Sequence, residues 1–231
     1  MSFFHPTEPI IRRKQEDLDV QDLKGLLQVN WKLGQKTLIS NTYTRIDQVF
    51  LIWGWMTLII FAIAQFMPIS WTTQAYWWSA LTLFGTLGMV ALTRCWVRIE
   101  RVSWLLYGWA ILMAAGLGLT NFGIFWGRPE ILLNLCPLWL TVCGLGYFLT
   151  AFALRSRTFL LSGSIHISGI FLLSYFPTWQ FLTTGLIMAG TMLFLAETQW
   201  DMRPPIDSPF LTVQELAFNR QQQKKRNRNF R

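Results

Sequence analysis

One residue of the chain has the chemistry of a buried cofactor ligand: His166. It lies within a long stretch that carries no formal charge, with Ser162 and Gly169 about one helical turn away on the same face. A neutral imidazole can ligate a haem iron or a chlorophyll magnesium, and small neighbours would leave room for a flat macrocycle. The alternative is a histidine that hydrogen-bonds to a serine across a helix interface. The only other histidine, His5, falls in a polar segment, so haem ligation by two histidines is not expected.

Motifs that support catalysis are missing from the rest of the sequence. It holds no Walker loop, no dinucleotide-binding glycine fingerprint and no pair of carboxylates within a segment that could cross a membrane. Cys95, Cys136 and Cys143 have no metal-ligand spacing, and we expect them to be small packing residues. Glu197 and Asp201 close the last charge-free stretch and are interpreted as interfacial charges. We therefore expect a protein that is not an enzyme.

The secondary structure that positions His166 and the cysteines is indicated by four stretches without Asp, Glu, Lys or Arg. They run over 48–93, 102–127, 131–154 and 158–196. A helix needs about 20 apolar residues to cross a bilayer core, so the first and last stretches can cross twice and the middle two once each. The sequence thus predicts an all-α integral membrane protein with six transmembrane helices, near 48–67, 76–95, 102–125, 131–154, 158–176 and 179–198. The last two are the shortest, and a pair that only dips into the membrane is the alternative. Pro137 is expected to kink the fourth helix.

The basic residues predict how these helices are oriented. Cytoplasmic loops are enriched in Lys and Arg, and nineteen of the twenty basic residues fall in the N-terminal segment, in the loops around Arg98 and Arg155, or in the C-terminal tail. Arg128 is the exception. This pattern predicts both termini on the cytoplasmic side of a bacterial plasma membrane, or on the stromal or matrix side of a thylakoid or organellar inner membrane.

A short repeat suggests three helical hairpins. The first, third and fifth predicted helices begin with similar pentapeptides whose central glycines, Gly54, Gly108 and Gly163, are 54 and 55 residues apart. A constant period is typical of one repeated unit, and chance likeness between Leu- and Gly-rich membrane helices is the alternative. The architecture is similar to that of the bacterial acid-resistance proteins built from three such hairpins. That resemblance covers the helical part only and carries no function.

Two polar segments flank the helical domain of residues 48–198. Residues 1–47 are predicted to be cytoplasmic and to hold an amphipathic helix over about 17–33, which lies on the membrane surface or docks a partner subunit. Residues 199–231 form a basic tail. This tail either acts only as a topology determinant or binds anionic lipid or an acidic partner, with nucleic acid disfavoured, through six clustered residues: Arg220, Lys224, Lys225, Arg226, Arg228 and Arg231.

Thirteen tryptophans are unusual for a chain of 231 residues. Those at predicted helix ends, such as Trp71, are typical of the aromatic belts at the two membrane surfaces. Trp53, Trp55, Trp109 and Trp139 are predicted to lie deeper, either as core packing or as the lining of a pigment or lipid surface.

Three functions fit these features. The first is a non-enzymatic accessory or assembly subunit that binds a larger membrane complex through its Trp-rich helices and its polar segments. The alternative is a small transporter or channel-like protein for a neutral or amphiphilic solute, because transport of charged solutes usually requires ionisable residues within the spans. The third is a haem- or chlorophyll-binding membrane protein that uses His166 as an axial ligand.

Overall fold

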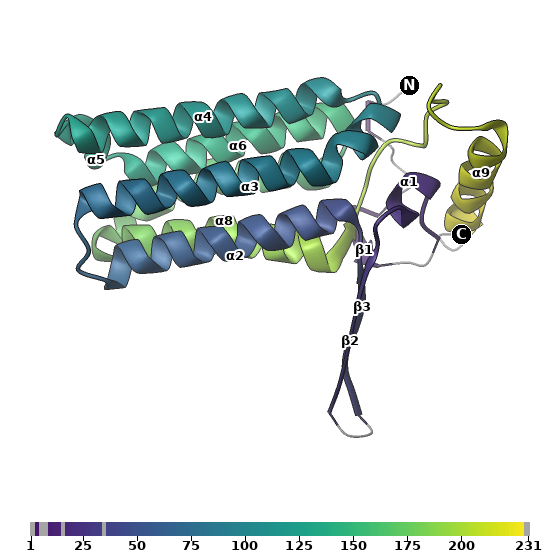
Figure 1. The fold of residues 1–231 in the computed structure, drawn as a ribbon, viewed down its shortest axis with the longest axis horizontal. Coiled ribbons are helices and arrows are strands. Elements are labelled where there is room, and N and C mark those ends of the chain that lie inside the picture. Colours follow the sequence, from purple (N-terminus) through teal and green to yellow (C-terminus); the bar gives the residue numbers. More distant parts are fainter. Residues whose placement is uncertain (1–2, 5–8, 15–16, 34–35, 229–231) are drawn as a thin grey trace.

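The computed structural model describes residues 3–4, 9–14, 17–33 and 36–228, and it is mostly helical (Figure 1). In that part of the chain, six helical segments are long and apolar enough to cross a membrane, which confirms the predicted number of spans. They are α2 (Arg45–Phe66), α3 (Trp71–Ile99), α4 (Ser103–Phe125), α6 (Leu135–Leu154), α7 (Arg157–Leu172) continued by the 3-10 turn η1 (Leu173–Tyr175), and α8 (Gln180–Glu197) preceded by η2 (Pro177–Trp179).

Local hydrogen bonds explain where the first spans begin. At the start of α2 the hydroxyl of Thr44 accepts from the backbone N–H of Asp47 at 3.2 Å, and the Asp47 carboxylate accepts from the Thr44 N–H at 2.8 Å. This capping box satisfies two N–H groups that the helix itself leaves free. Ser70 caps α3 in the same way by accepting from the N–H of Thr73 at 3.2 Å.

The predicted fourth helix, over 131–154, is divided in the structure. A single turn, α5 (Pro129–Leu132), is followed by α6, which begins at Leu135. The expected kink at Pro137 is therefore wrong, because this proline lies in the first turn of α6. The missing N–H of a proline costs nothing there, since the first N–H groups of a helix have no partner within it.

The six spans form an elongated bundle whose axes run in roughly the same direction (Figure 1). The most extensive contacts join α2 to α8, α6 to α7 and α3 to α4, and contacts of α2 with α3 and of α4 with α6 complete the bundle. Helix α6 is the most buried of the six. Large apolar side chains such as Phe84, Ile111 and Phe171 cover the outside, as expected for a surface that faces lipid. Whether the three hairpins are copies of one unit stays a prediction.

The N-terminal segment differs from its prediction. The helix expected over 17–33 is only the single turn α1 (Val20–Leu23), and β2 (Leu27–Leu33) follows it and pairs antiparallel with β3 (Lys36–Tyr43). Gly25, with φ +85°, ends the helical path. Residues 27–33 then alternate apolar and polar, which is the period of a strand and not of a helix. The β2–β3 hairpin projects from one end of the bundle (Figure 1).

The two terminal segments lie together at this same end of the bundle (Figure 1). The short strand β1 (Ile11–Arg13) pairs antiparallel with β4 (Thr198–Trp200), which directly follows α8. Helix α1 packs against α9 (Val213–Arg228). The end of α3 with Arg98, and Arg155 directly after α6, are also here, because Arg98 lies over the ring of Phe210 and Arg155 over the ring of Phe3.

Candidate functional site in the centre of the bundle

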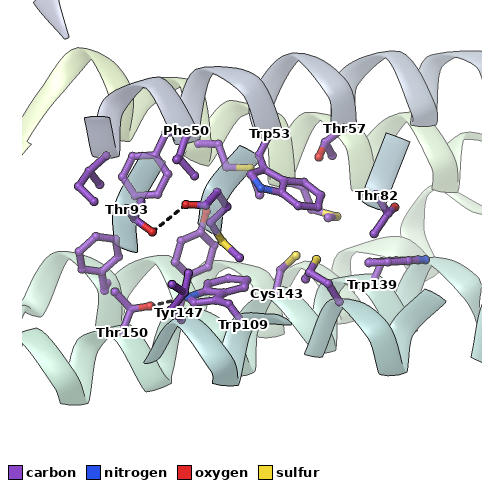
Figure 2. Close-up of a pocket in the computed structure, with 18 of the residues that line it drawn as sticks. Phe50, Trp53, Thr57, Thr82, Thr93, Trp109, Trp139, Cys143, Tyr147 and Thr150 are labelled. Atoms are coloured by element: carbon purple, nitrogen blue, oxygen red, sulfur yellow. Dashed lines mark hydrogen bonds between the residues drawn. The ribbon is translucent and has the colours of Figure 1, made fainter. Parts of the chain in front are cut away.

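A cavity of about 140 Å³ lies between the helices (Figure 2). One water molecule needs roughly 10–15 Å³ of such volume, so the space could hold a molecule much larger than water. Its walls come from α2, α3, α4, α6 and α8. Phe159, at the start of α7, and Trp200, in β4, contribute at the end nearest the termini, where their rings are 4.8 Å apart.

The cavity is elongated along the bundle. On α6 its lining includes both Trp139 and Thr150, and on α3 it includes both Thr82 and Thr93. Each pair is eleven residues apart, which corresponds to about 16 Å along a helix. Figure 2 shows Thr93 and Thr150 toward one end of the cavity and Thr82 and Trp139 toward the other, and the lining continues beyond the latter pair to Phe61 and Trp78. The space therefore suits an extended molecule.

Three of the four tryptophans that were predicted to lie deep line this cavity: Trp53, Trp109 and Trp139. Trp55 is exposed on the outer surface of α2. The indole N–H of Trp109 donates to the Thr150 hydroxyl at 3.0 Å, and a second lining indole, that of Trp139, donates to a threonine hydroxyl of α4 at 3.2 Å. These bonds fix the orientation of the two rings in the cavity wall.

The lining carries no formal charge. Among the described residues that line it, none is Asp, Glu, Lys, Arg or His; the polar members are Thr, Cys, Tyr and Trp side chains. A charged solute would lose its hydration without gaining a counter-ion, which costs several kcal/mol. Of the three cysteines, Cys143 lines the cavity and Cys136 is buried beside it, whereas Cys95 is exposed, so the predicted packing role is wrong for Cys95.

His166 is fully buried but is not part of this lining. Its Nδ1 lies 2.8 Å from the carbonyl oxygen of Ser162, so Nδ1 carries the proton and donates, while Nε2 has no partner in the described part of the chain. The predicted bond to a serine across an interface is thus replaced by a bond within α7. The ring also packs against Tyr147, with centroids 4.9 Å apart.

The space expected for a macrocycle beside His166 is occupied by side chains. A Cβ atom built on Gly163 would lie 2.6 Å from the ring of Phe148, and one built on Gly169 would lie 2.8 Å from Ile187. These glycines let α6 and α8 approach α7 closely, which is the usual use of small residues in membrane helices. Axial ligation by His166 stays a prediction, which an absorption spectrum of the purified protein tests through its haem or chlorophyll bands.

The predicted lipid-binding residues of the tail are only partly available. Arg226 is buried and donates to both carboxylate oxygens of Asp19, at 3.0 and 3.1 Å, and Arg220 donates to Asp207 at 2.8 Å. The tail is therefore largely the helix α9, which docks on the N-terminal segment. Three further members are exposed, namely Lys224, Lys225 and Arg228. His5 and Arg231 lie outside the described residues.

A cluster of carboxylates that the sequence did not predict lies beneath α9. Asp22 accepts from the Trp96 indole N–H at 2.9 Å, and Glu100 accepts from the Gln21 amide at 2.8 Å. Burial, together with the nearby charge of Asp19, raises the pKa of Asp22 to about 7. Burial also raises the pKa of Glu100, against the opposing effect of an arginine. The cluster joins α1 to the end of α3.

Two acidic residues at and after the end of α8, Glu197 and Asp201, act as local anchors, and their placement at the membrane interface stays a prediction. Asp201 is buried and accepts from the N–H and Nε of Arg157, and from the N–H and hydroxyl of Thr158, at 2.7–3.0 Å. Burial alone would raise the pKa of Asp201. The hydrogen bonds have a larger effect in the opposite direction, so the pKa of Asp201 is lowered overall. Glu197 accepts from the hydroxyl of Tyr43 at 2.7 Å and so holds the base of the β2–β3 hairpin.

No protein family, curated protein sequence or solved structure matches the chain. Functional assignment therefore depends on the sequence and on the geometry described above. The cavity is the feature that sequence reasoning missed most completely. The only signal it left was the set of deep tryptophans, whose role as a lining was one of two alternatives.

Proposed function

We propose that this protein is a non-enzymatic, multi-pass membrane protein that holds one small, uncharged and mostly apolar molecule in its central cavity, as a small transporter or carrier of a neutral or amphiphilic solute. The observation that carries the proposal is the cavity itself, with aromatic walls and no Asp, Glu, Lys, Arg or His in its described lining. Ligand sites are typically concave, mostly apolar and supplied with a few polar groups. An apolar space of this size also leaves its lining side chains without contacts unless something fills it.

We further propose that both termini face the cytoplasm, or the stroma or matrix of an organelle. Arg98, Arg155, β1 and α9 share one end of the bundle, and Arg128 follows α4 at the opposite end. Lys and Arg are retained on the cytoplasmic side during membrane insertion. In this orientation Phe159 and Trp200 line the cytoplasmic end of the cavity.

The test is to identify what the cavity holds. Protein purified in mild detergent is extracted with organic solvent, and neutral molecules are quantified by mass spectrometry per mole of chain. Cys143→Phe places a bulky ring in the cavity, while Cys95→Phe adds the same ring on an exposed position and serves as the matched control. We expect about one retained molecule per chain for the wild type and for Cys95→Phe, and a large loss for Cys143→Phe.

Two readouts keep this test decisive. Thermal unfolding should show all three proteins folded, and the wild type should lose stability when its ligand is stripped, because a ligand that binds only the folded state raises the unfolding temperature. Equal retention of the same molecules by Cys143→Phe and Cys95→Phe would mean that they bind on the outer surface, and the proposal would fail.

A second candidate is an accessory or assembly subunit of a larger membrane complex. It is favoured by the β2–β3 hairpin, which extends beyond the bundle and leaves Leu27 and Val29 exposed. An exposed pair of strands is a ready template for a partner. We expect a partner to co-purify in fixed stoichiometry with the wild type and to be lost from the double variant Leu27→Glu/Val29→Glu. A partner retained by that variant would rule out the hairpin as its docking site.

A further inference from the structure

Two threonine hydroxyls in the cavity lack the hydrogen bond that comparable residues make. In the membrane helices most buried or half-buried threonines donate to the carbonyl oxygen four residues earlier, at 2.7–2.8 Å: Thr86, Thr93, Thr120, Thr141, Thr150 and Thr191. The hydroxyls of Thr57 and Thr82 have no such bond and no other partner within the described part of the chain. Their side chains are nevertheless buried, with only 4% and 5% of each residue exposed.

These two residues lie toward the same end of the cavity, one helical turn from the last lining residues of their helices at that end, Phe61 and Trp78. Thr57 comes from α2 and Thr82 from α3, both belong to the lining, and Figure 2 places both near Trp139 and away from Thr93 and Thr150. The hydroxyl oxygens of Thr57 and Thr82 are not fully covered by protein atoms. Since both residues line the cavity, we take the accessible side of each hydroxyl to face the cavity. The threonines at the other end already have partners.

An unpaired hydroxyl in apolar surroundings is unfavourable, and a bound oxygen atom would remove that cost. A hydroxyl that faces an apolar cavity without a partner loses about 1–3 kcal/mol relative to one that is hydrogen-bonded. A ligand carbonyl can accept from both threonines, and a ligand hydroxyl can accept from one and donate to the other. A charged head group is excluded by the absence of a counter-ion among the described lining residues.

The depth of this end in the membrane further restricts the chemical class of the ligand's head group. Thr57 is the thirteenth residue of α2, which places it about 18 Å along the helix from Arg45 and so near the middle of the bilayer core. Phospholipids keep their head groups at the membrane surface, so a head group held at this depth has to be small and uncharged. Beyond it, about 16 Å of apolar cavity extends toward Trp109 and Phe50.

We infer that the cavity binds an uncharged amphiphile with a single oxygen-bearing head, a carbonyl or a hydroxyl, which hydrogen-bonds to Thr57 and Thr82 while its apolar chain lies along Trp109 and Tyr147. This inference rests on the proposed function and specifies its ligand. It assigns Thr57 and Thr82 as the residues that determine specificity.

Three radiolabelled probes of matched chain length test it: methyl decyl ketone, dodecanol and dodecane. Binding is measured to protein in lipid nanodiscs, after subtracting retention by empty nanodiscs. The decisive variant is Thr57→Val/Thr82→Val, which removes both hydroxyls and changes shape little. Thr93→Val is the matched control, because its hydroxyl lines the same cavity but is already bonded to the carbonyl of Met89. Thr57→Ser/Thr82→Ser keeps both hydroxyls and should bind as the wild type does.

We expect the wild type to bind the ketone, the alcohol or both about tenfold more tightly than dodecane, and the double valine variant to lose about that factor, as two modest hydrogen bonds would give. Dodecane binding should change by less than about twofold in every variant. If the double valine variant does not fold, each single valine variant is measured and should show part of the loss.

The two ideas fail in different ways. If dodecane and the oxygenated probes bind equally, or if the valine variants bind them as the wild type does, the inference about Thr57 and Thr82 is overturned and the cavity remains a site. If no probe is retained above the level of empty nanodiscs, the proposed function itself is overturned. A preference for one oxygenated probe over the other identifies the head group and supports the inference.

Discussion

Removing the guanidinium of Arg226 should release α9 from the body of the protein. Arg226 donates to Asp19, and the side chains of the pair are only 9% and 8% exposed. It also donates to the backbone carbonyl of Asp17 at 2.7 Å. Arg226→Ala would leave the Asp19 carboxylate buried without this partner, and breaking a buried pair in this way typically costs about 3–5 kcal/mol.

The same helix supplies a matched control. Arg220 pairs with Asp207, but these side chains are 67% and 71% exposed. Exposed ion pairs contribute about 0–1 kcal/mol. Since about 1.4 kcal/mol corresponds to a factor of ten, Arg226→Ala should raise the population of undocked α9 by roughly a hundredfold or more, and Arg220→Ala by about fivefold at most.

Limited proteolysis measures this population directly. Trypsin can cut after Lys224 in both variants, and when opening is fast relative to cleavage the rate follows the fraction of open molecules. Hydrogen exchange of the α9 amides gives an independent measure. The reasoning would be refuted if Arg226→Ala and Arg220→Ala were cleaved at similar rates. A second check is Asp19→Asn/Arg226→Gln, which removes both charges of this pair and should recover part of the loss, because burying the two neutral side chains costs less than burying one charge without the other.

Three further predictions concern other charges. The Asp22 carboxyl keeps its proton up to about pH 7 in the folded protein but loses it near its ordinary pKa of 3.8 when unfolded, so docking of α1 should weaken as the pH rises through this interval, and Asp22→Asn should reduce the pH dependence of hydrogen exchange there to the part that Glu100 contributes. For topology, cysteines replacing Arg128 and Arg98 should react with membrane-impermeant thiol reagents from opposite sides of sealed vesicles; labelling from one side would contradict the proposed orientation. Asp201→Ala should lower the free energy of unfolding by about 2–4 kcal/mol because it leaves several buried donors unpaired, whereas Glu197→Gln should lower it by about 1 kcal/mol or less, and similar melting temperatures for the two variants would contradict this.

The membrane helices were predictable because charge is the strongest signal in such a sequence. The third predicted helix, over 102–125, matches α4 (Ser103–Phe125) almost to the residue, since Arg101 and Arg128 bound an apolar stretch of the right length. The helix expected over 17–33 failed for a local reason. Val20, Leu23, Leu27 and Trp31 have helical spacing and favour a helix, but the strict alternation over 27–33 favours a strand, and Gly25, with φ +85°, separates the two elements.

The cavity could not be predicted because the spans are apolar on every side. When a helix has apolar residues all round, its sequence does not indicate which face is turned inward. Trp53 and Trp55 illustrate this, since they are two residues apart and equally apolar, yet one lines the cavity and the other is exposed on the outer surface. The acidic cluster was hidden for a different reason: Asp22 and Glu100 are far apart in the chain and are brought together only by packing of α1 on α3.

The pairing of β1 with β4 constrains the order in which the protein can be completed on the ribosome. Ile11 is paired with Trp200, so the first strand leaves the ribosome long before its partner is synthesised, by roughly 10–40 s at ordinary elongation rates. During that interval the ion pair between Asp19 and Arg226 cannot yet form. The part of α1 and its flanking residues that α9 covers, including Asp19, is thus uncovered throughout helix insertion, and β1 and α1 complete their contacts only after the last span and α9 have been synthesised. Chains that stall before α9 would therefore leave the residues that α9 covers exposed.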